Sequence, residues 1–177
     1  RLCEDCYDGW LCPEDLNNLK TAEENYQATK LAESEIQARI SDVVEFAHLA
    51  MAQPNHYLWG GTLGPHYDCS GFIQAAFASA GVWIPRDAYQ QEDFSHPIRI
   101  CELEPGDLIF FGSACRTTHV GLCIRGSKYI HSSGRDCGRD GIGIDQLSLP
   151  RDKTSQWLFD NLRCASRIIK NFRPKGA

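Results

Sequence analysis

The sequence lacks an excess of basic charge and any long apolar run. Lysine and arginine together number 18 against 23 aspartates and glutamates, so the formal net charge is −5. No stripe of Lys and Arg forms a nucleic-acid surface. No apolar stretch approaches the roughly 20 residues that a membrane-spanning helix needs. Internal repeats are also missing. We therefore expect neither nucleic acid nor a membrane as partner, and we expect a monomer.

Cysteine, in contrast, is abundant. The nine cysteines are an odd number, follow no short secreted framework and in part lie in apolar runs. This pattern favours free thiols in a reducing compartment, so we expect a cytoplasmic location, with the cell envelope or secretion as the alternative. Cys3, Cys6 and Cys12 have no second Cys-x2-Cys motif or ligand pair nearby, so we predict neither a metal site nor a cofactor. The chain begins with Arg1, and we expect it to be part of a longer product.

Hydrophobic periodicity predicts helices in the first half of the chain and strands in the second. Apolar residues recur at spacings of three and four over residues 34–52, with Ser34 as N-cap and Gln37 three residues on. Residues 85–91 form a loop that leads into a short helical turn. The predicted strands are residues 108–111, 119–124, 128–133 and 164–169. Helices followed by strands indicate an α+β fold with an antiparallel sheet.

The first 20 residues differ from the rest. Asp8-Gly9 is a turn signal that is followed by Trp10-Leu11, which is typical of the end of a β-hairpin. We predict that residues 1–20 are the C-terminal part of a small β domain, residues 21–33 a polar linker, and residues 34–177 the main domain.

The tripeptide Asp68-Cys69-Ser70 is the most informative motif. It lies between a glycine-rich turn, residues 57–61, and an apolar run of helical spacing that ends at Gly81. Cys69 is therefore predicted at a helix N-terminus, where unpaired N–H groups and the helix dipole favour a thiolate. Asp68 caps the helix and Ser70 fills its first turn, and both are also candidate substrate contacts. The alternative is that Cys69 is an inert, buried cysteine.

Two histidines follow in successive predicted strands. With a three-residue turn over residues 125–127, His131 lies opposite Gly121, and His119 and His131 share a face about 7–8 Å apart. A two-residue turn without a compensating bulge would place His131 on the other face. The order of the residues then predicts a cysteine hydrolase in which Cys69 attacks, His119 is the base and His131 orients it. Either histidine alone is more often a structural imidazole.

Tyr57 precedes Cys69 in the glycine-rich turn. Its phenol is a candidate donor to a developing oxyanion, beside the backbone N–H of Cys69. The alternative is an aromatic side chain that packs the turn.

Together these motifs resemble the NlpC family of bacterial cell-wall cysteine peptidases. They are Tyr57-x-Trp-Gly-Gly, Asp68-Cys-Ser-Gly-Phe, Pro85-Arg, Pro105-Gly-Asp-Leu-Ile-Phe-Phe, His119-Val-Gly and His131, within residues 40–170. The resemblance implies a papain-like α+β fold, with N-terminal helices packed on an antiparallel sheet. It also implies the triad Cys69, His119 and His131, with Tyr57 at the oxyanion and a substrate site shaped by Asp68, Ser70 and Arg86.

The N-terminal hairpin resembles the end of a bacterial SH3-like barrel, as in cyanobacterial-type enzymes of this family. There Glu4, Asp5 and Tyr7 would cap the site and bind the free amine of a small peptide such as L-Ala-γ-D-Glu-diaminopimelate. The implied function is a γ-D-glutamyl–L-diamino acid endopeptidase that acts on peptidoglycan stem peptides or muropeptides in cell-wall turnover or recycling. The alternatives are a papain-like amidase or acyltransferase on another amide, and a catalytically silent module that binds wall fragments.

Overall fold

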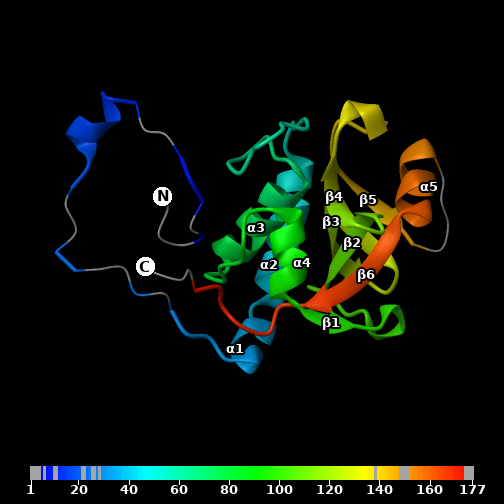
Figure 1. Cartoon of the computed structure of the whole chain (residues 1–177). Helices are drawn as coiled ribbons and strands as arrows, with labels where there is room; N and C mark the ends of the chain where they lie inside the picture. Colours follow the sequence, from blue (N-terminus) through cyan, green and yellow to red (C-terminus); the bar gives the residue numbers. More distant parts are fainter. Residues whose placement is uncertain are drawn as a thin grey trace.

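The computed structural model describes residues 5, 7–9, 12–20, 23–24, 27, 29–137, 139–147 and 152–173. These residues form an α+β fold, as predicted, with helices on both faces of an antiparallel sheet (Figure 1). The helices are α1 (Glu33–Gln37), α2 (Ile40–Ala52), α3 (Cys69–Ser79), α4 (Ala88–Phe94) and α5 (Lys153–Asp160). The strands are β1 (His96–Ile98), β2 (Leu108–Ser113), β3 (Arg116–Arg125), β4 (Lys128–Ser133), β5 (Gly141–Gln146) and β6 (Leu162–Arg167), in the order β1-β6-β2-β3-β4-β5.

The sheet separates two apolar clusters because side chains alternate between its faces. On one face α2 and α3 cover the sheet, and Phe72 and Phe77 of α3 pack in one cluster with Phe110 and Val120. On the other face α5 contributes Leu158 to a smaller cluster, which includes Ile109, Phe111, Cys123 and Tyr129. Figure 1 shows α2, α3 and α4 on one side of the strands and α5 on the other. The predicted strands are confirmed, whereas β1, β5 and α5 were not anticipated.

The single helix predicted over residues 34–52 is wrong at its start. The chain instead forms α1 and α2, with a turn at Ala38 and Arg39 between them. The Arg39 side chain donates a hydrogen bond to the carbonyl of Ala80, 2.9 Å away at the end of α3, and this long-range contact fixes the turn. The N-cap is Ala32 rather than Ser34, and the Glu35 carboxylate accepts the Ala32 N–H at 2.7 Å.

The α3 helix begins and ends where the sequence predicts. Its first residue is Cys69, and Asp68 is the N-cap. At the C-terminus Gly81 has φ +73°, its N–H bonds the carbonyl of Ala78, and the Val82 N–H bonds that of Phe77. This is a Schellman motif, which glycine favours because it adopts positive φ without a Cβ clash.

The hairpin that carries the two histidines reaches the predicted register by another route. The predicted three-residue turn is wrong: Arg125 pairs with Lys128, so Gly126 and Ser127 form a two-residue turn. A bulge between Cys123 and Arg125 compensates, and Leu122 pairs with Ile130. Continued by one residue, this register places His131 opposite Gly121, on the predicted face.

The predicted hairpin within residues 1–20 lies largely outside the described residues, so the SH3-like assignment and the domain boundaries stay predictions. The described residues 12–20 are exposed and include a 3-10 helix, Asp15–Asn18. In Figure 1 this part of the chain runs apart from the helices and the sheet.

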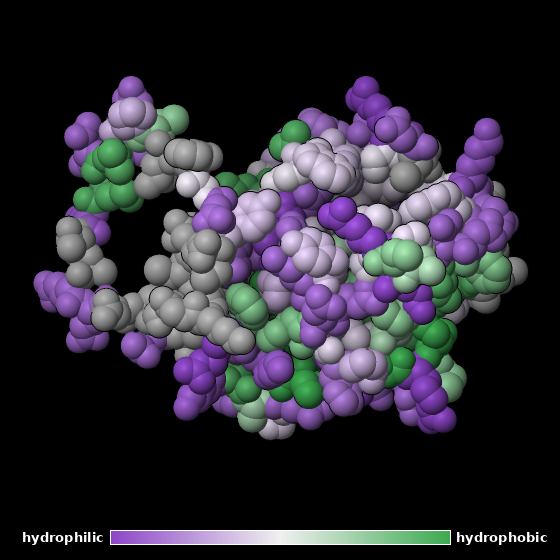
Figure 2. All heavy atoms as spheres, viewed as in Figure 1, coloured by the Kyte–Doolittle hydropathy of each residue, from purple (hydrophilic) through white to green (hydrophobic). Residues whose placement is uncertain are grey.

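The described residues contain no candidate membrane-spanning helix. Within the described ranges no helix combines the length and the hydrophobicity that crossing a bilayer requires. On the face shown in Figure 2, apolar side chains are interspersed with hydrophilic ones.

Gly71, in the first turn of α3, marks the closest approach of two segments. A Cβ at this position would lie 2.1 Å from the backbone oxygen of Gly61, which accepts the Asp68 N–H. We expect Gly71→Ala to lower the free energy of unfolding by about 1–3 kcal/mol, because the backbone must move apart. Urea denaturation measures this change. The matched control is Gly134→Ala, whose Cβ would meet Tyr57 at an ordinary 3.5 Å; equal stability of the two variants would contradict this packing.

Candidate active site

The carboxylate of Asp68 joins three segments around Cys69. It accepts the Gly71 N–H at 2.7 Å as N-cap of α3, and the Gly60 N–H of the glycine-rich turn at 2.9 Å. Arg86, which precedes α4, donates to both of its oxygens at 3.1 and 2.6 Å, and also to the Ser70 hydroxyl at 2.9 Å. Asp68 and Arg86 are both buried, so the start of α3 is fixed by a buried ion pair in which both carboxylate oxygens accept hydrogen bonds.

The glycine-rich turn folds back on itself beside this pair. Gly60 has φ +79°, and the Gly61 N–H bonds the carbonyl of Leu58. The Leu58 N–H bonds the carbonyl of Tyr67, and the Tyr57 N–H donates to the Asp140 carboxylate at 3.2 Å. These bonds hold Tyr57 at the rim of the site.

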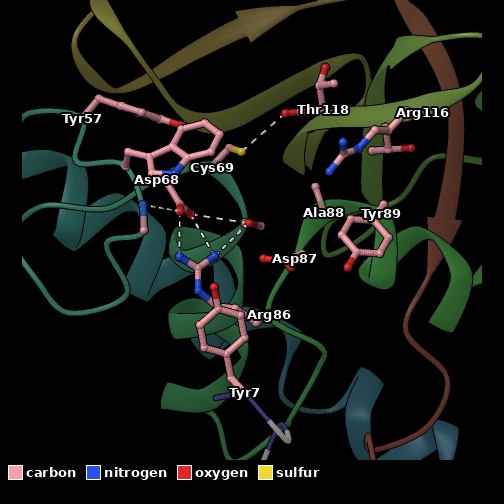
Figure 3. A pocket seen from close by; sticks show the side chains of 14 residues that line it. Tyr7, Tyr57, Asp68, Cys69, Arg86, Asp87, Ala88, Tyr89, Arg116 and Thr118 are labelled. Carbon is pink, nitrogen blue, oxygen red and sulfur yellow. Dashed lines mark hydrogen bonds and ion pairs between the residues drawn. The ribbon is translucent and has the colours of Figure 1, made fainter. Parts of the chain in front are cut away.

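The thiol of Cys69 meets strand β3 on both sides of His119. Its sulfur lies 4.0 Å from the carbonyl oxygen of Thr118 (Figure 3). The backbone N–H of Val120 also interacts with it and acts to lower the pKa of the thiol. The structure therefore brings the predicted nucleophile to the strand position that carries the predicted base.

His119 and His131 are bonded to each other in the interior. Nε2 of His119 lies 2.8 Å from Nδ1 of His131, and the ring planes are close to perpendicular. Both side chains are buried. Nε2 of His119 is therefore engaged with His131, and Nδ1 is its other ring nitrogen.

The sequence analysis missed the group behind His131. Nε2 of His131 lies 2.8 Å from Oδ2 of Asp145, and Arg139 donates to both oxygens of that carboxylate at 2.7 and 2.8 Å. Asp145 belongs to β5, which pairs His131 with Gly143. The alternation of residues 141–146 was the signal that could have identified this strand and its buried acid.

Six of the predicted site residues line one pocket of about 480 Å³, whereas His119 and His131 lie behind its wall and do not line it. Its walls include Tyr7, Tyr57, Asp68, Cys69, Ser70 and Arg86, together with Trp59, Asp87, Tyr89, Arg116 and Thr118, which were not predicted. Figure 3 shows Cys69 between the Asp68–Arg86 pair and the wall that carries Tyr89 and Arg116. Glu4, the remaining predicted contact, lies outside the described residues.

The described part of the N-terminal segment contacts the pocket from one side. The guanidinium of Arg86 lies 5.7 Å from the centre of the Tyr7 ring, within the range of a cation–π contact. Asp5 accepts a hydrogen bond from the Gln74 side chain of α3 at 2.9 Å. Tyr7 therefore forms one end of the pocket.

The geometry has a counterpart among known proteins. The NlpC/P60 family model matches residues 54–159, which include Cys69, His119, His131 and Asp145. The chain belongs to the NlpC/P60 family. A curated relative, the gamma-D-glutamyl-L-lysine dipeptidyl-peptidase of Bacillus subtilis, is 30% identical over 80% of this chain and 45% of its own length.

A second curated relative is named for other bonds, and a solved structure shares the fold. The murein DD-endopeptidase MepS/murein LD-carboxypeptidase of Escherichia coli is 33% identical over 53% of this chain and 48% of its own. The crystal structure of an NlpC/P60 family protein from Bacillus cereus has a TM-score of 0.62 at 28% identity, over 73% of this chain and 40% of that one. The chain thus spans less than half the length of each of these three relatives.

In this NlpC/P60 domain the thiol and the imidazole are both neutral at rest. Burial, and secondly the charge of Asp68, raise the pKa of the Cys69 thiol to about 12, against the opposing effect of the helix N–H of Ser70. Burial and the neighbouring His131 hold the pKa of His119 well below its usual value. The helix N-terminus predicted to favour a thiolate is present, but desolvation outweighs it.

This balance predicts how Cys69 reacts with iodoacetamide. Because only the thiolate is alkylated, we expect the rate at Cys69 in the free protein to be low at pH 6 and to rise steadily with pH through the alkaline range. Peptide mass spectrometry of timed samples measures the rate, with the exposed Cys101 as internal reference. Faster labelling of Cys69 than of Cys101 at pH 6 would show a resting thiolate instead.

Proposed function

We propose that this NlpC/P60 domain is a cysteine endopeptidase that hydrolyses the γ-D-glutamyl–L-diamino acid amide bond of peptidoglycan stem peptides. The observation that carries the proposal is the Cys69 thiol at the start of α3, set against β3 at His119, whose ring is bonded to His131. The 30% identity with the Bacillus subtilis gamma-D-glutamyl-L-lysine dipeptidyl-peptidase supports the choice of bond.

The proposed reaction proceeds in two halves. The Cys69 sulfur attacks the amide carbon while Nδ1 of His119 takes the thiol proton, so that a C–S bond forms and the carbonyl oxygen becomes negative. His119 then gives this proton to the leaving amine, the C–N bond breaks, and a thioester remains. Water attacks the thioester, His119 takes and returns the proton, and the free acid and the thiol result.

The oxyanion needs donors at the mouth of α3. The backbone N–H of Cys69 is the first of the helix and has no partner within it. Tyr57, at the rim of the same pocket, is the proposed second donor.

Arg116 offers the pocket a cation for a carboxylate of the substrate. Asp68 and Arg86 neutralise each other, while Arg116 is exposed on the opposite wall, with its guanidinium 5.7 Å from the Tyr89 ring centre. A γ-linked D-glutamate carries a free α-carboxylate on the acyl side of the scissile bond, two methylene groups from the carbonyl carbon. We assign Arg116 to that carboxylate, with Ser70 and the Asp68–Arg86 pair shaping the other wall.

Competing proposals differ in the bond. The name of the Escherichia coli relative makes a D,D or L,D bond of the same stem peptides the second candidate. A papain-like amidase or acyltransferase would use the same Cys69 and His119. The buried Cys69, His119 and His131 together count against a silent binding module, because such a module has no need for a bonded pair of histidines.

Replacement of the nucleophile tests the reaction class. We expect Cys69→Ala to lower the hydrolysis of L-Ala-γ-D-Glu-L-Lys and of the diaminopimelate tripeptide by more than about 10³-fold, because no other cysteine of the described residues lines the pocket. Mass spectrometry identifies the cleaved bond, and circular dichroism checks the fold. Cys101→Ala, at an exposed thiol, is the control that keeps full activity. Retained activity in Cys69→Ala would exclude the mechanism, and cleavage elsewhere would exclude the bond.

We further propose that the segment with Asp5 and Tyr7 limits substrates to small peptides with a free amine, as in wall-peptide recycling. Tyr7 closes one end of the pocket, so only a short stretch of peptide fits before the scissile bond. Glu4, outside the described residues, is the predicted partner of the amine.

Acetylated and free tripeptides separate this role from turnover of the polymer. We expect N-acetylation of L-Ala-γ-D-Glu-L-Lys to lower kcat/KM by at least about tenfold, the loss of one charge-assisted contact. In Tyr7→Ala this difference is expected to shrink. Equal cleavage of both peptides by the unaltered protein would count against the proposal.

A further inference from the structure

A buried hydrogen-bonded chain continues beyond the two histidines. It runs from His119 to His131 at 2.8 Å and from His131 to Asp145 at 2.8 Å. His131 is 0% exposed and Asp145 only 8%. Three ionisable side chains from three neighbouring strands, β3, β4 and β5, are therefore linked in a line that ends on a carboxylate.

Arg139 binds the carboxylate at the end of this hydrogen-bonded chain from the surface side. It donates to Oδ1 and Oδ2 of Asp145 at 2.7 and 2.8 Å, and lies 3.7 Å from Asp152, the N-cap of α5. Gly143 makes room for it, since a Cβ there would lie 2.6 Å from a guanidinium nitrogen of Arg139. The backbone of β5 is thus adapted to hold Arg139 on Asp145.

The charged groups around Asp145 keep it ionised. Burial acts to raise its pKa, but the hydrogen bond from His131 and the charge of Arg139 outweigh burial and hold it below its usual value. Asp152 acts against Arg139, and Tyr129 stays a neutral phenol because burial raises its pKa. Asp145 is therefore a carboxylate throughout the neutral range.

This carboxylate fixes the direction of every proton in the chain. An ionised carboxylate only accepts hydrogen bonds, so Nε2 of His131 must be the donor. A neutral His131 then has its lone pair on Nδ1, so Nε2 of His119 must donate in turn. The lone pair of a neutral His119 is left on Nδ1. We propose that Asp145, held by Arg139, is a positioning residue that sets both tautomers and thereby makes Nδ1 of His119 the base; this rests on the proposed role of His119.

The same chain stabilises the charge that catalysis creates. When His119 takes the thiol proton, a buried imidazolium forms, and a buried charge without a partner is costly. Asp145 supplies the opposite charge through His131. Burial and His131 keep His119 neutral before substrate arrives, and Arg139 weakens the effect of Asp145 on His131. A merely structural ion pair would have neither consequence.

The test uses the Asp145→Asn variant of the whole protein, because asparagine keeps the shape of the aspartate side chain and loses its charge. We expect kcat to fall by at least about 100-fold, but by less than the ~10⁴-fold that follows the loss of a carboxylate bonded directly to the base. KM should stay within about threefold of its value in the unaltered protein. The acid limb of the pH profile should move to lower pH, since the imidazolium loses its counter-charge. Nitrogen-15 NMR should show His119 protonated at Nε2 in the unaltered protein and a changed tautomer in the variant.

Arg139→Gln should shift the acid limb of the pH profile in the opposite direction. This variant leaves the Asp145 carboxylate in place and removes the positive charge that offsets it. The tautomers should therefore persist, and the acid limb should move to higher pH. This second variant keeps the proposal testable if Asp145→Asn fails to fold.

The matched control is Asp107→Asn. Asp107 is a buried carboxylate immediately before β2, and Arg167 donates two hydrogen bonds to it, of 2.8 and 2.9 Å. The Asp107→Asn variant should be less stable, while kcat, the pH profile and the tautomers of His119 and His131 stay unchanged. Unchanged His119 tautomers in Asp145→Asn, or equal losses in both variants without a shifted limb, would overturn the proposal. The NMR result decides it even if the peptides above are not substrates, so the two failures are distinguishable.

Discussion

The buried carboxylate of Asp68 is the constraint on which the site depends. A charge in the interior is tolerable only when it is paired and its lone pairs are satisfied. Asp68 meets this need with the Arg86 guanidinium and two backbone N–H groups, and its three groups of partners lie in three separate segments. Satisfying one acid therefore brings the glycine-rich turn, the start of α3 and the loop before α4 together. Cys69 follows Asp68 directly, so its position is set by the same bonds.

This constraint also shapes the chemistry of the thiol. The ion pair that positions Cys69 places a negative charge beside it, and burial adds to the cost of ionisation. The helix N-terminus cannot offset both effects, so the proposed nucleophile needs a base that removes its proton during the attack. His119 suits that role because burial keeps its imidazole neutral. Position and reactivity thus come from the same residues, and the second depends on the orientation of His119.

Local pattern predicted much of this arrangement, and long-range contacts account for what it missed. The α3 helix followed from apolar spacing, the Asp68 cap and Gly81, all of which act within one element. The face shared by His119 and His131 was predicted although the turn was not, because the bulge before Arg125 restores the register that burial demands. The break at Arg39 depends on Ala80, far along the chain. Strand β5 was missed because Gly141 and Gly143 lower its strand propensity, and Asp145 was missed with it.

A neutral histidine between base and carboxylate solves a problem of charge placement. A carboxylate bonded directly to His119 would stand close to Cys69 and Asp68, and a further negative charge there would raise the pKa of the thiol again. With His131 in between, orientation passes through two hydrogen bonds, while the charge stays in β5. There Arg139, which is partly exposed, reaches it from the surface. The second histidine therefore separates the two tasks of a carboxylate, so that the proton direction is kept and the repulsion of the thiolate is reduced.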